Sequence, residues 1–516
     1  MAAISFPSGA ITGEPIAGSA PKSAALGTAG SGSGCAAATA PTSAAAQVNA
    51  IPRKNPAPMI APCIFPCQLH LADAREASGI GAVRRPEPRR PQGVEAAGTE
   101  VRGIDPMQKS LRLALPALAL LAACNAGSEL SARQTAAPAA DGELPFAMTR
   151  VAAFDAPWAM AFLPDGRMLV TEKAGRILLV SADGRQRQVI ANVDVVFQGQ
   201  GGLLDVIPAP DFAKSRQVYY TYAEPRPQGS SLAMARATFV DGTAPMLANP
   251  QVLWRAGSDG RGGQFGAVIA FAPDGKSLFL TSGERQRFTP AQDPNQALGK
   301  ILHLTLDGKP APGNPWAGKT GTATVTVTDP PRNTELAKTA PARTQAVEGT
   351  NLVPAETWTL GHRNPYGLVF DASGRLWENE MGPKGGDEVN LIRRGRNYGW
   401  PLVSDGDNYD GTPIPRHAPG DGFEAPAAYW NPSISPGGMI YYSGSMFPAW
   451  KGSLLIGALS GRALIRVALD GDKASKAEQW NLDMRIRDVA QGPDGAVWLL
   501  EDAGKANGRL FRLTPK

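Results

Sequence analysis

Short runs of apolar residues, with small or polar residues between them, recur along the chain after residue 150. Four segments each contain an apolar strand, a turn with Asp and Gly, and a second apolar strand. These segments are residues 157–172, 266–284, 364–380 and 486–502. Asp-Gly between alternating apolar residues is the strongest local signal for a β-hairpin. The pattern therefore predicts a series of similar hairpins.

Further strands are expected after these hairpins, at 175–184, 299–308, 462–471 and 508–516. Two less regular units lie at 201–224 and 437–459. A repeated unit of about four strands is typical of a propeller blade. We therefore predict an all-β, six-bladed β-propeller over residues 149–516. The terminal strands are expected to pair and close the ring, although the pattern does not show this. The alternative fold, a β-sandwich, would leave the repeat unexplained.

The composition agrees with a chain of many short strands. Of 516 residues, 58 are Gly and 46 are Pro, which is too many turn formers for a helical protein. The net charge of +5 is spread thinly, without a Lys/Arg-rich run, so nucleic acid is not an expected partner. The four cysteines are Cys35, Cys63, Cys67 and Cys124, so the predicted propeller contains neither a disulfide nor a cysteine metal site.

The N-terminal part of the chain has a different character. Residues 1–106 are rich in Ala, Gly, Pro and Ser without a sustained apolar period, and are expected to be disordered. From Met107 the chain has two basic residues, an apolar stretch and Leu-Ala-Ala-Cys ending at Cys124. Residues 107–124 are thus typical of a secretory signal peptide of the lipoprotein type. The apolar stretch is too short for an ordinary membrane span.

This signal leads to an interpretation of the start of the protein. We expect translation to begin at Met107, with residues 1–106 derived from a mis-assigned upstream start. Residues 125–148 would form a flexible tether. The protein would be exported, periplasmic and anchored to the membrane only through a lipid at Cys124. A secretory signal cut elsewhere and a chance apolar segment are the alternatives.

Two neighbouring segments carry most of the candidate chemistry. Residues 361–367 read GHRNPYG, and residues 379–401 read NEMGPKGGDEVNLIRRGRNYGWP. Glycines, adjacent acids, an Arg-Asn pair and aromatic residues are typical of a ligand site built on loops. Together with QGQGGLLD at 198–205, these segments resemble the pyrroloquinoline quinone (PQQ) dependent glucose/sorbosone dehydrogenases, most closely the soluble aldose sugar dehydrogenases. The likeness runs from about Pro157 to the C-terminus.

The resemblance implies a set of cofactor-binding residues. In the family, the Arg-Asn pair binds the quinone and polarises its reactive carbonyl. Arginine is a fixed fork of donors that suits carboxylates, and PQQ is a tricarboxylate. Two arginines at i and i+2 on a strand point to the same face and could reach one anion. The candidates are Gln200, Arg363, Asn364, Tyr409, Arg485 and Arg487.

The same resemblance implies calcium. Ca²⁺ takes carboxylate and backbone carbonyl oxygens, and loops with Gly and Pro can direct such carbonyls inward. Glu388 and Tyr398 match positions assigned to calcium in the family. The carbonyls of Gly382 and Pro383 would hold the ion that bridges to PQQ.

The sequence departs from the family where the chemistry should start. Gln264 replaces the histidine that serves as general base, and an amide cannot accept a proton near neutral pH. Met381, Ser460 and Tyr366 also replace family residues. Glu284, near the end of the following strand, could take the proton instead if burial raised its pKa.

The predicted function is PQQ-dependent oxidation of an aldose to its lactone, with the electrons passed to a separate acceptor. Arg363, Gln264 and Glu284 are the candidates for catalytic roles. One alternative is a propeller that binds PQQ or sugar with little or no turnover. The other is a calcium-dependent propeller hydrolase or lactonase, which would use metal-bound water and no quinone.

Overall fold

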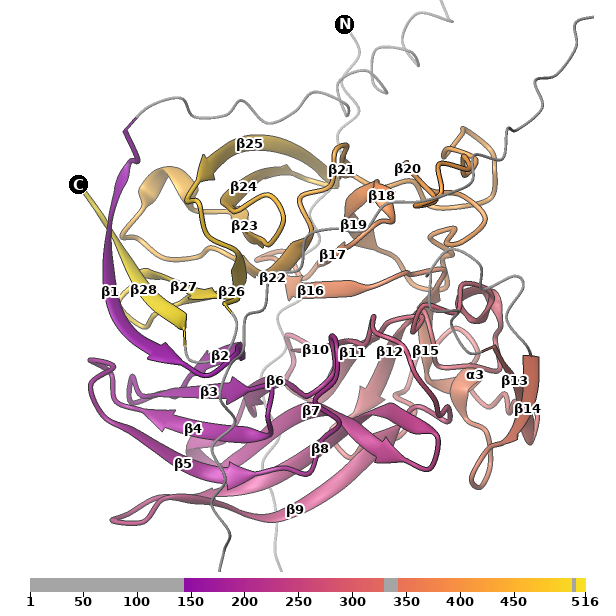
Figure 1. The fold of residues 1–516 in the computed structure, drawn as a ribbon, viewed down its shortest axis with the longest axis horizontal. Helices are drawn as coiled ribbons and strands as arrows, with labels where there is room; N and C mark the ends of the chain where they lie inside the picture. The colour runs from indigo at the N-terminus through magenta and orange to yellow at the C-terminus, as the bar shows by residue number, and fades with distance from the viewer. Residues whose placement is uncertain (1–142, 329–341, 504–506) are drawn as a thin grey trace, which may run out of the picture. The chain divides into compact units, whose positions relative to one another are not determined.

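The computed structural model describes residues 143–328, 342–503 and 507–516. Within these residues the chain forms six four-stranded antiparallel sheets, which confirms the six-bladed β-propeller (Figure 1). The predictions for residues 1–106, for the signal peptide at 107–124 with Cys124, and for most of the tether lie outside this part of the chain. None of the helices in the described ranges is long and apolar enough to cross a membrane.

The first three blades follow the chain order. The first contains β2 (Pro157–Phe162), β3 (Met168–Glu172), β4 (Arg176–Val180) and β5 (Arg187–Asn192). The second contains β6 (Leu203–Pro208), β7 (Gln217–Arg226), β8 (Gly229–Val240) and β9 (Met246–Arg255). The third contains β10 (Gly266–Phe271), β11 (Ser277–Ser282), β12 (Lys300–Thr305) and β15 (Thr357–Leu360).

The last three blades complete the ring. The fourth contains β16 (Pro365–Phe370), β17 (Leu376–Glu380), β19 (Asp387–Ile392) and β21 (Ala428–Trp430). The fifth contains β22 (Pro436–Tyr441), β23 (Ser453–Ala458), β24 (Ala463–Asp470) and β25 (Lys473–Asn481). The sixth combines β26 (Ile486–Gln491), β27 (Val497–Glu501) and β28 (Gly508–Pro515) with β1 (Phe146–Phe154).

Smaller elements lie in the connections between the blade strands. Two-stranded sheets are formed by β13 (Thr324–Thr328) with β14 (Ala342–Ala346), and by β18 (Lys384–Gly385) with β20 (Gly406–Asp407). The short helices are α2 (Phe212–Ser215), α3 (Val353–Glu356) and the 3₁₀ turns Thr289–Gln292 and Pro448–Trp450.

The two ends of the described chain close the ring. β1 pairs with β28 in antiparallel register from Phe146 opposite Pro515 to Phe154 opposite Gly508. Figure 1 shows the indigo β1 beside the yellow β28. The first strand begins at Phe146, so it starts inside the segment that the sequence assigned to the tether.

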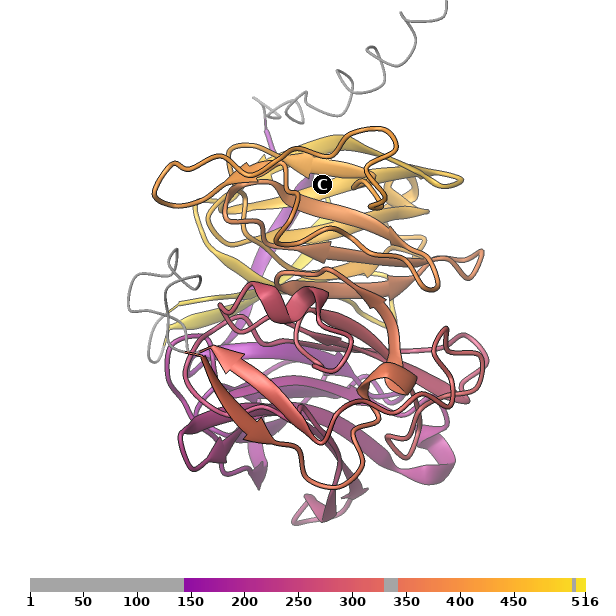
Figure 2. The same cartoon turned by 90° about the vertical axis from the view of Figure 1, so that its right-hand side faces the viewer.

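The first strands of successive blades contact one another around the ring, in the order β2, β6, β10, β16, β22, β26 and back to β2. Figure 2, turned by 90°, shows the blades coloured orange and yellow above those coloured indigo to magenta. In every blade the pairing of the first and second strands shifts register at a bulge. A bulge adds a residue to one strand and increases the local twist.

Three buried threonines connect neighbouring blades. Each hydroxyl accepts a hydrogen bond from the first strand of its own blade and donates one to the first strand of the next. Thr171 accepts from Ala159 N and donates to Leu204 O, at 3.0 and 2.6 Å. Thr221 and Thr281 repeat this arrangement in the second and third blades. These hydroxyls therefore set the spacing between adjacent inner strands.

A cavity of about 220 Å³ lies where the six first strands meet, so it is the central channel. Two carboxylates face this channel. Asp205 accepts a hydrogen bond from Ile269 N of the next blade, and Asp488 accepts one from Met160 N of the first blade. Burial raises the pKa of Asp205 to about 6 and that of Asp488 to about 7.

Candidate functional site

The candidate residues gather at one face of the propeller because of how the strands run. Each first strand is antiparallel to its second strand. The loop that enters a first strand therefore lies at the same face as the loop that leaves a second strand. Gln200, Gln264 and Arg363 lie in entering loops, whereas Glu284 lies in a leaving loop.

Arg363 lies at the centre of the residues that the sequence assigned to the cofactor. Its guanidinium donates to the carbonyls of Met381 and Gly382 at 2.8 and 2.6 Å, and its backbone N–H donates to Glu380 Oε2 at 2.5 Å. The residue is 7% exposed, and its Nε is buried without a hydrogen-bond partner. An unpaired buried donor is costly, so this nitrogen suits an acceptor on a bound ligand.

Two aromatic residues surround the Arg363 side chain. The guanidinium carbon is 5.2 Å from the ring centre of Trp400 and 5.9 Å from that of Tyr409. Tyr409 is 49% exposed, and its hydroxyl is 3.4 Å from Arg363 Nη2. The structure thus brings together two residues that the sequence assigned to the cofactor, although 46 positions separate them.

A chain of amide groups links three blades beside this cluster. Gln264 N donates to Gln200 Oε1 at 2.6 Å, and Tyr366 Oη donates to the same oxygen at 3.3 Å. Gly266 N donates to Asn364 Oδ1 at 3.3 Å. The structure therefore brings Gln200, Gln264 and Asn364 into one network.

Gln264 is held in an unusual backbone conformation. Its φ angle is +55°, in the left-handed region, and its side-chain oxygen accepts from Gln286 N at 3.2 Å. Arg285, Gln286 and Phe288 also have positive φ angles near +60°. Such residues are costly and tend to cluster at functional sites. The residues around the expected base position are therefore strained as a group.

Glu284 lies beside this strained group and is 1% exposed. Its Oε2 accepts hydrogen bonds from the backbone N–H groups of Arg287 and Phe288, and its own N–H donates to Arg363 O at 2.9 Å. Burial raises the pKa of Glu284, and the charge of Arg363 opposes the rise. A carboxylate with a raised pKa is suited to accept a proton near neutral pH.

Arg485 and Arg487 lie together at the same face, at the entrance to β26. Their side chains both bind Asp502, with Nη2 to carboxylate distances of 2.9 Å. The Arg487 guanidinium carbon is 5.8 Å from the ring centre of Tyr366. Arg487 therefore reaches the Gln200 network through Tyr366, whereas Arg485 is more exposed and lies at the rim.

Three carboxylates lie on one face of the fourth blade. Glu378 and Glu380 are on β17, where they oppose Asn390 and Glu388 of β19. The amide nitrogen of Asn390 donates to Glu378, Glu380 and Glu388 at 3.0, 3.4 and 3.1 Å. Like charges on facing strands are destabilising unless a proton or a cation neutralises them.

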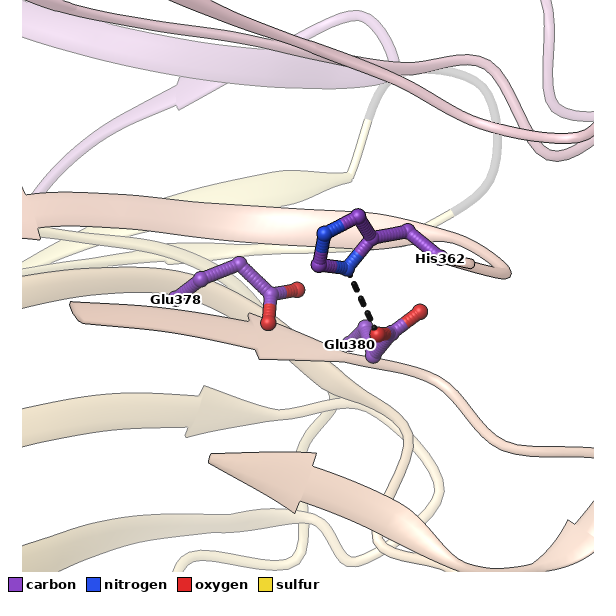
Figure 3. A group of neighbouring side chains, drawn as sticks. All are labelled: His362, Glu378 and Glu380. Carbon is purple, nitrogen blue, oxygen red and sulfur yellow. Dashed lines mark hydrogen bonds and ion pairs between the residues drawn. The ribbon is translucent and has the colours of Figure 1, made fainter. Parts of the chain in front are cut away.

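The surroundings of this carboxylate cluster support a cation. Burial, and to a smaller extent the charge of Glu380, raises the pKa of Glu378 and of Glu388 well above the usual range. The Oε1 of Glu378 and the Oδ1 of Asn390 are buried without hydrogen-bond partners. Figure 3 shows His362, whose Nδ1 bonds Glu380 Oε1 at 3.0 Å, beside Glu378. The candidate ligand atoms of these three residues lie within 4.8 Å of one another.

The other residues expected to bind calcium lie near this cluster, and some of their oxygens already take part in hydrogen bonds. The Tyr398 ring stacks on His362 at 4.7 Å, but its hydroxyl donates to Leu391 O and accepts from Arg393 N. Gly382 O already accepts from Arg363, and Pro383 is buried. The phenol of Tyr398 is therefore engaged in local bonds, which leaves the carboxylates as the better cation ligands.

Sequence reasoning missed several residues of these clusters. Glu378 and Glu380 alternate on a strand, as do Glu388 and Asn390, and this period of two places each pair on one face. That signal was available in the sequence. Lys173, which binds Asp502 at 3.0 Å, gave no such signal because 329 positions separate the two residues.

The protein is therefore a six-bladed β-propeller whose connecting loops bring the candidate residues together at one face of the ring. The glucose/sorbosone dehydrogenase family model matches residues 154–345 and 336–512. The chain belongs to this family of oxidoreductases.

Individual relatives agree with this assignment. The aldose sugar dehydrogenase YliI of Escherichia coli is 36% identical over 372 residues, which cover 70% of this chain and 91% of that protein. The apo-form structure of the soluble aldose sugar dehydrogenase from Escherichia coli covers 72% of this chain and 100% of its own, at 33% identity and a TM-score of 0.61. The PQQ-bound aldose sugar dehydrogenase from Streptomyces coelicolor covers 72% and 98%, at 27% identity and a TM-score of 0.55. Family membership favours the dehydrogenase over the calcium-dependent hydrolase.

Proposed function

We propose that this protein is a PQQ-dependent sugar dehydrogenase that oxidises aldoses to lactones and passes the electrons to a separate acceptor. The observation that carries the proposal is the unpartnered, buried Nε of Arg363 within a network of donors from several blades. The quinoprotein relatives and the family assignment support the same chemistry. The substrate would be a small aldose rather than a polymer or a nucleic acid.

The residues present fit the cofactor. Arg363 and Asn364 would bind the quinone oxygens, and Gln200, Tyr409, Arg485 and Arg487 would hold the rest of the molecule. PQQ, when bound, supplies the quinone that accepts a hydride from the sugar. The role of the chain is to orient both molecules and to supply positive charge where negative charge develops.

The carboxylate cluster fits calcium. Ca²⁺ prefers six to eight oxygen ligands, and Glu378, Glu380 and Glu388 offer carboxylates on one face. We propose that these residues hold the ion, with His362 orienting Glu380 through its Nδ1. A bound cation would offset both the burial and the charge of Glu380, which raise the pKa values of Glu378 and Glu388.

Proton removal is assigned to Glu284. Gln264 stands where the family has its base, and its amide is bonded to Gln286 N and cannot accept a proton. Glu284 is a buried carboxylate beside Arg363 with a raised pKa. The second candidate function follows from the same substitution at Gln264: a propeller that binds PQQ without significant turnover.

The location of the protein is also part of the proposal. The pattern at residues 107–124 favours export and lipidation at Cys124, which would place the propeller in the periplasm. There the reduced cofactor would pass its electrons to another molecule. Cys124→Ala should abolish lipid modification and release the protein from the membrane fraction, whereas an unchanged distribution would contradict the anchor.

The experiment that tests the function is a titration followed by an assay. Apo protein is titrated with PQQ in the presence of Ca²⁺ and then in its absence, and binding is followed by absorbance. We expect binding only with Ca²⁺, and dye reduction when an aldose is added. Binding without reduction of dye by any of several aldoses would support the inactive binding protein. Absence of binding would overturn the proposal.

Variants connect the titration to the site. Arg363→Ala should weaken PQQ binding by about 1.5–3 kcal/mol, the size of a charge-assisted hydrogen bond. Glu378→Gln should lower the affinity for Ca²⁺ while leaving the fold intact, since it removes one carboxylate charge of the cluster. A Glu378→Gln protein with unchanged calcium affinity would remove this cluster as the ion site.

A further inference from the structure

Asp502 lies between three cationic side chains. Lys173 Nζ is 3.0 Å from its Oδ1, Arg487 Nη2 is 2.9 Å from the same oxygen, and Arg485 Nη2 is 2.9 Å from its Oδ2. Lys173 comes from the turn between β3 and β4 of the first blade, whereas the arginines and Asp502 belong to the sixth blade. The four side chains thus bridge the first and sixth blades.

The group carries a surplus of positive charge. One carboxylate faces three cations, and the neighbouring acid Glu172 is already paired with Arg176 and bonded to Asp155 N. Burial would raise the pKa of Asp502, but the charges of Arg487 and Lys173 hold it well below its usual range. Burial, together with the charge of Arg487, lowers the pKa of Lys173. A further anion at this place would therefore be stabilising.

The position of Lys173 connects this cluster to the ligand site. Its carbonyl accepts from Leu203 N at 3.0 Å, and a Cβ on Gly202 would come within 2.3 Å of that carbonyl oxygen. The backbone of Lys173 therefore lies against the segment that follows Gln200. Arg487 in turn lies over Tyr366, whose hydroxyl donates a hydrogen bond to Gln200. Lys173 and Arg487 are thus both connected to the Gln200 segment, the first through its backbone and the second through Tyr366.

The exposure of these side chains fits ligand binding. The side chains of Lys173 and Arg487 are 14% and 10% exposed, so both are mostly withdrawn from water but still reachable. Partly desolvated cations bind anions more strongly than fully exposed ones because the solvent screens them less. Asp502 fixes both in place without neutralising the pair.

We propose that Lys173 is a third cation of the subsite that binds the carboxylates of PQQ, with Asp502 acting as a positioning residue that holds Lys173 and Arg487 toward the ligand. This inference rests on the proposed function. It assigns a direct cofactor contact to a residue of the first blade, so that the cofactor would link the first and sixth blades.

The test is PQQ binding by Lys173→Met in the full chain, measured by absorbance titration with Ca²⁺ present. Loss of one charge-assisted contact should weaken the affinity by about 10- to 100-fold. The affinity should also depend less steeply on ionic strength than in the wild type, because a charge has been removed from the site. A purely structural role of Lys173 would not change that salt dependence.

Matched variants separate the possible outcomes. Lys214→Met, which removes an exposed lysine from the last turn of α2, should bind like the wild type. Lys173→Arg should retain most of the affinity, and Lys173→Gln replaces the methionine variant if that protein folds poorly. Wild-type affinity and salt dependence in both uncharged variants would overturn the inference while leaving the proposed function intact. Failure of the wild type to bind PQQ would instead overturn the proposed function.

Discussion

At the scale of single residues, the site around Gln264 combines strain with a change of chemistry. Gln264 and three residues of the 285–288 segment have left-handed backbone conformations. Backbone N–H groups of this segment donate hydrogen bonds to the side chains of Glu284 and Gln264. Histidine tolerates the left-handed region better than most residues do. The backbone at position 264 could therefore accept a histidine, and the present glutamine is not required by the local conformation.

The identity of the base is the first prediction. Glu284→Gln should lower the rate of aldose oxidation by about 10²–10⁴-fold without loss of PQQ binding, since it removes the proton acceptor and keeps the side-chain shape. The measurement is dye reduction at saturating aldose, with absorbance titration of PQQ as the control. An active Glu284→Gln protein would show that the base lies elsewhere.

Gln264→His gives the complementary prediction. If Glu284 serves as base, the histidine should change the rate little. If the wild type binds PQQ but oxidises aldoses weakly, the histidine should raise the rate, because it restores a group that titrates near neutral pH. A fully active wild type that is indifferent to both substitutions would contradict both assignments.

At the scale of the blades, the threonines on the second strands connect one sheet to the next. Thr281 accepts from Val268 N at 2.9 Å and donates to Pro365 O at 3.1 Å, and it is fully buried. Pro365 begins the strand that follows Arg363 and Asn364. The Thr281 hydroxyl of the third blade therefore also helps to position Arg363 and Asn364, which directly precede Pro365 in the fourth blade.

Thr281→Val tests this connection with a side chain of nearly the same shape. The valine leaves a buried N–H and a buried carbonyl unpaired, so the free energy of unfolding should fall by about 2–4 kcal/mol. Thr149→Val, at an exposed position of β1, is the matched control and should have little effect. The measurement is chemical denaturation. An equal loss in both variants would show that the connection across blades does not contribute.

At the scale of the whole propeller, the central channel is lined by the carboxyl groups of Asp205 and Asp488. Asp205 and Asp488 each bind an N–H of the neighbouring blade, so they stabilise the ring while burial disfavours their ionised forms. Both pKa values, about 6 and about 7, are raised above the ordinary value of 3.8. The folded ring therefore binds protons that the unfolded chain would release.

The sign of the resulting pH dependence follows from linkage. A carboxyl with a raised folded-state pKa contributes stability that is fully present below its unfolded pKa and is lost as the pH rises through the folded value. The contributions of Asp205 and Asp488 should therefore decline between about pH 4 and pH 7. Melting temperatures of the apo wild type and of Asp488→Asn, measured from pH 5 to pH 8, should show a flatter dependence in the variant. Parallel curves would contradict the raised pKa of Asp488.

The hairpins and the loops between them could be predicted from the amino-acid sequence. The Asp-Gly turns at 157–172 and 486–502 and the apolar alternation around them are local, so neighbouring residues suffice to specify them. The Arg-Asn pair and Glu388 could likewise be found, because glycine-rich loops with charged residues beside them stand out from strands. The period of two that places Glu378 and Glu380 on one face of a strand is also present in the sequence.

The contacts between residues far apart in the chain could not be predicted in this way, because they depend on how the blades pack. The pairing of β1 with β28, the contact of Lys173 with Asp502 and the approach of Arg363 to Tyr409 join positions whose separation carries no periodic signal. Glu380 lies opposite Glu388 because of the register in which β17 pairs with β19. The bond from Gln264 to Gln200 depended on the packing of one blade against the next. Local pattern specifies the elements of this protein, whereas its site is built from contacts that exist only after the ring has closed.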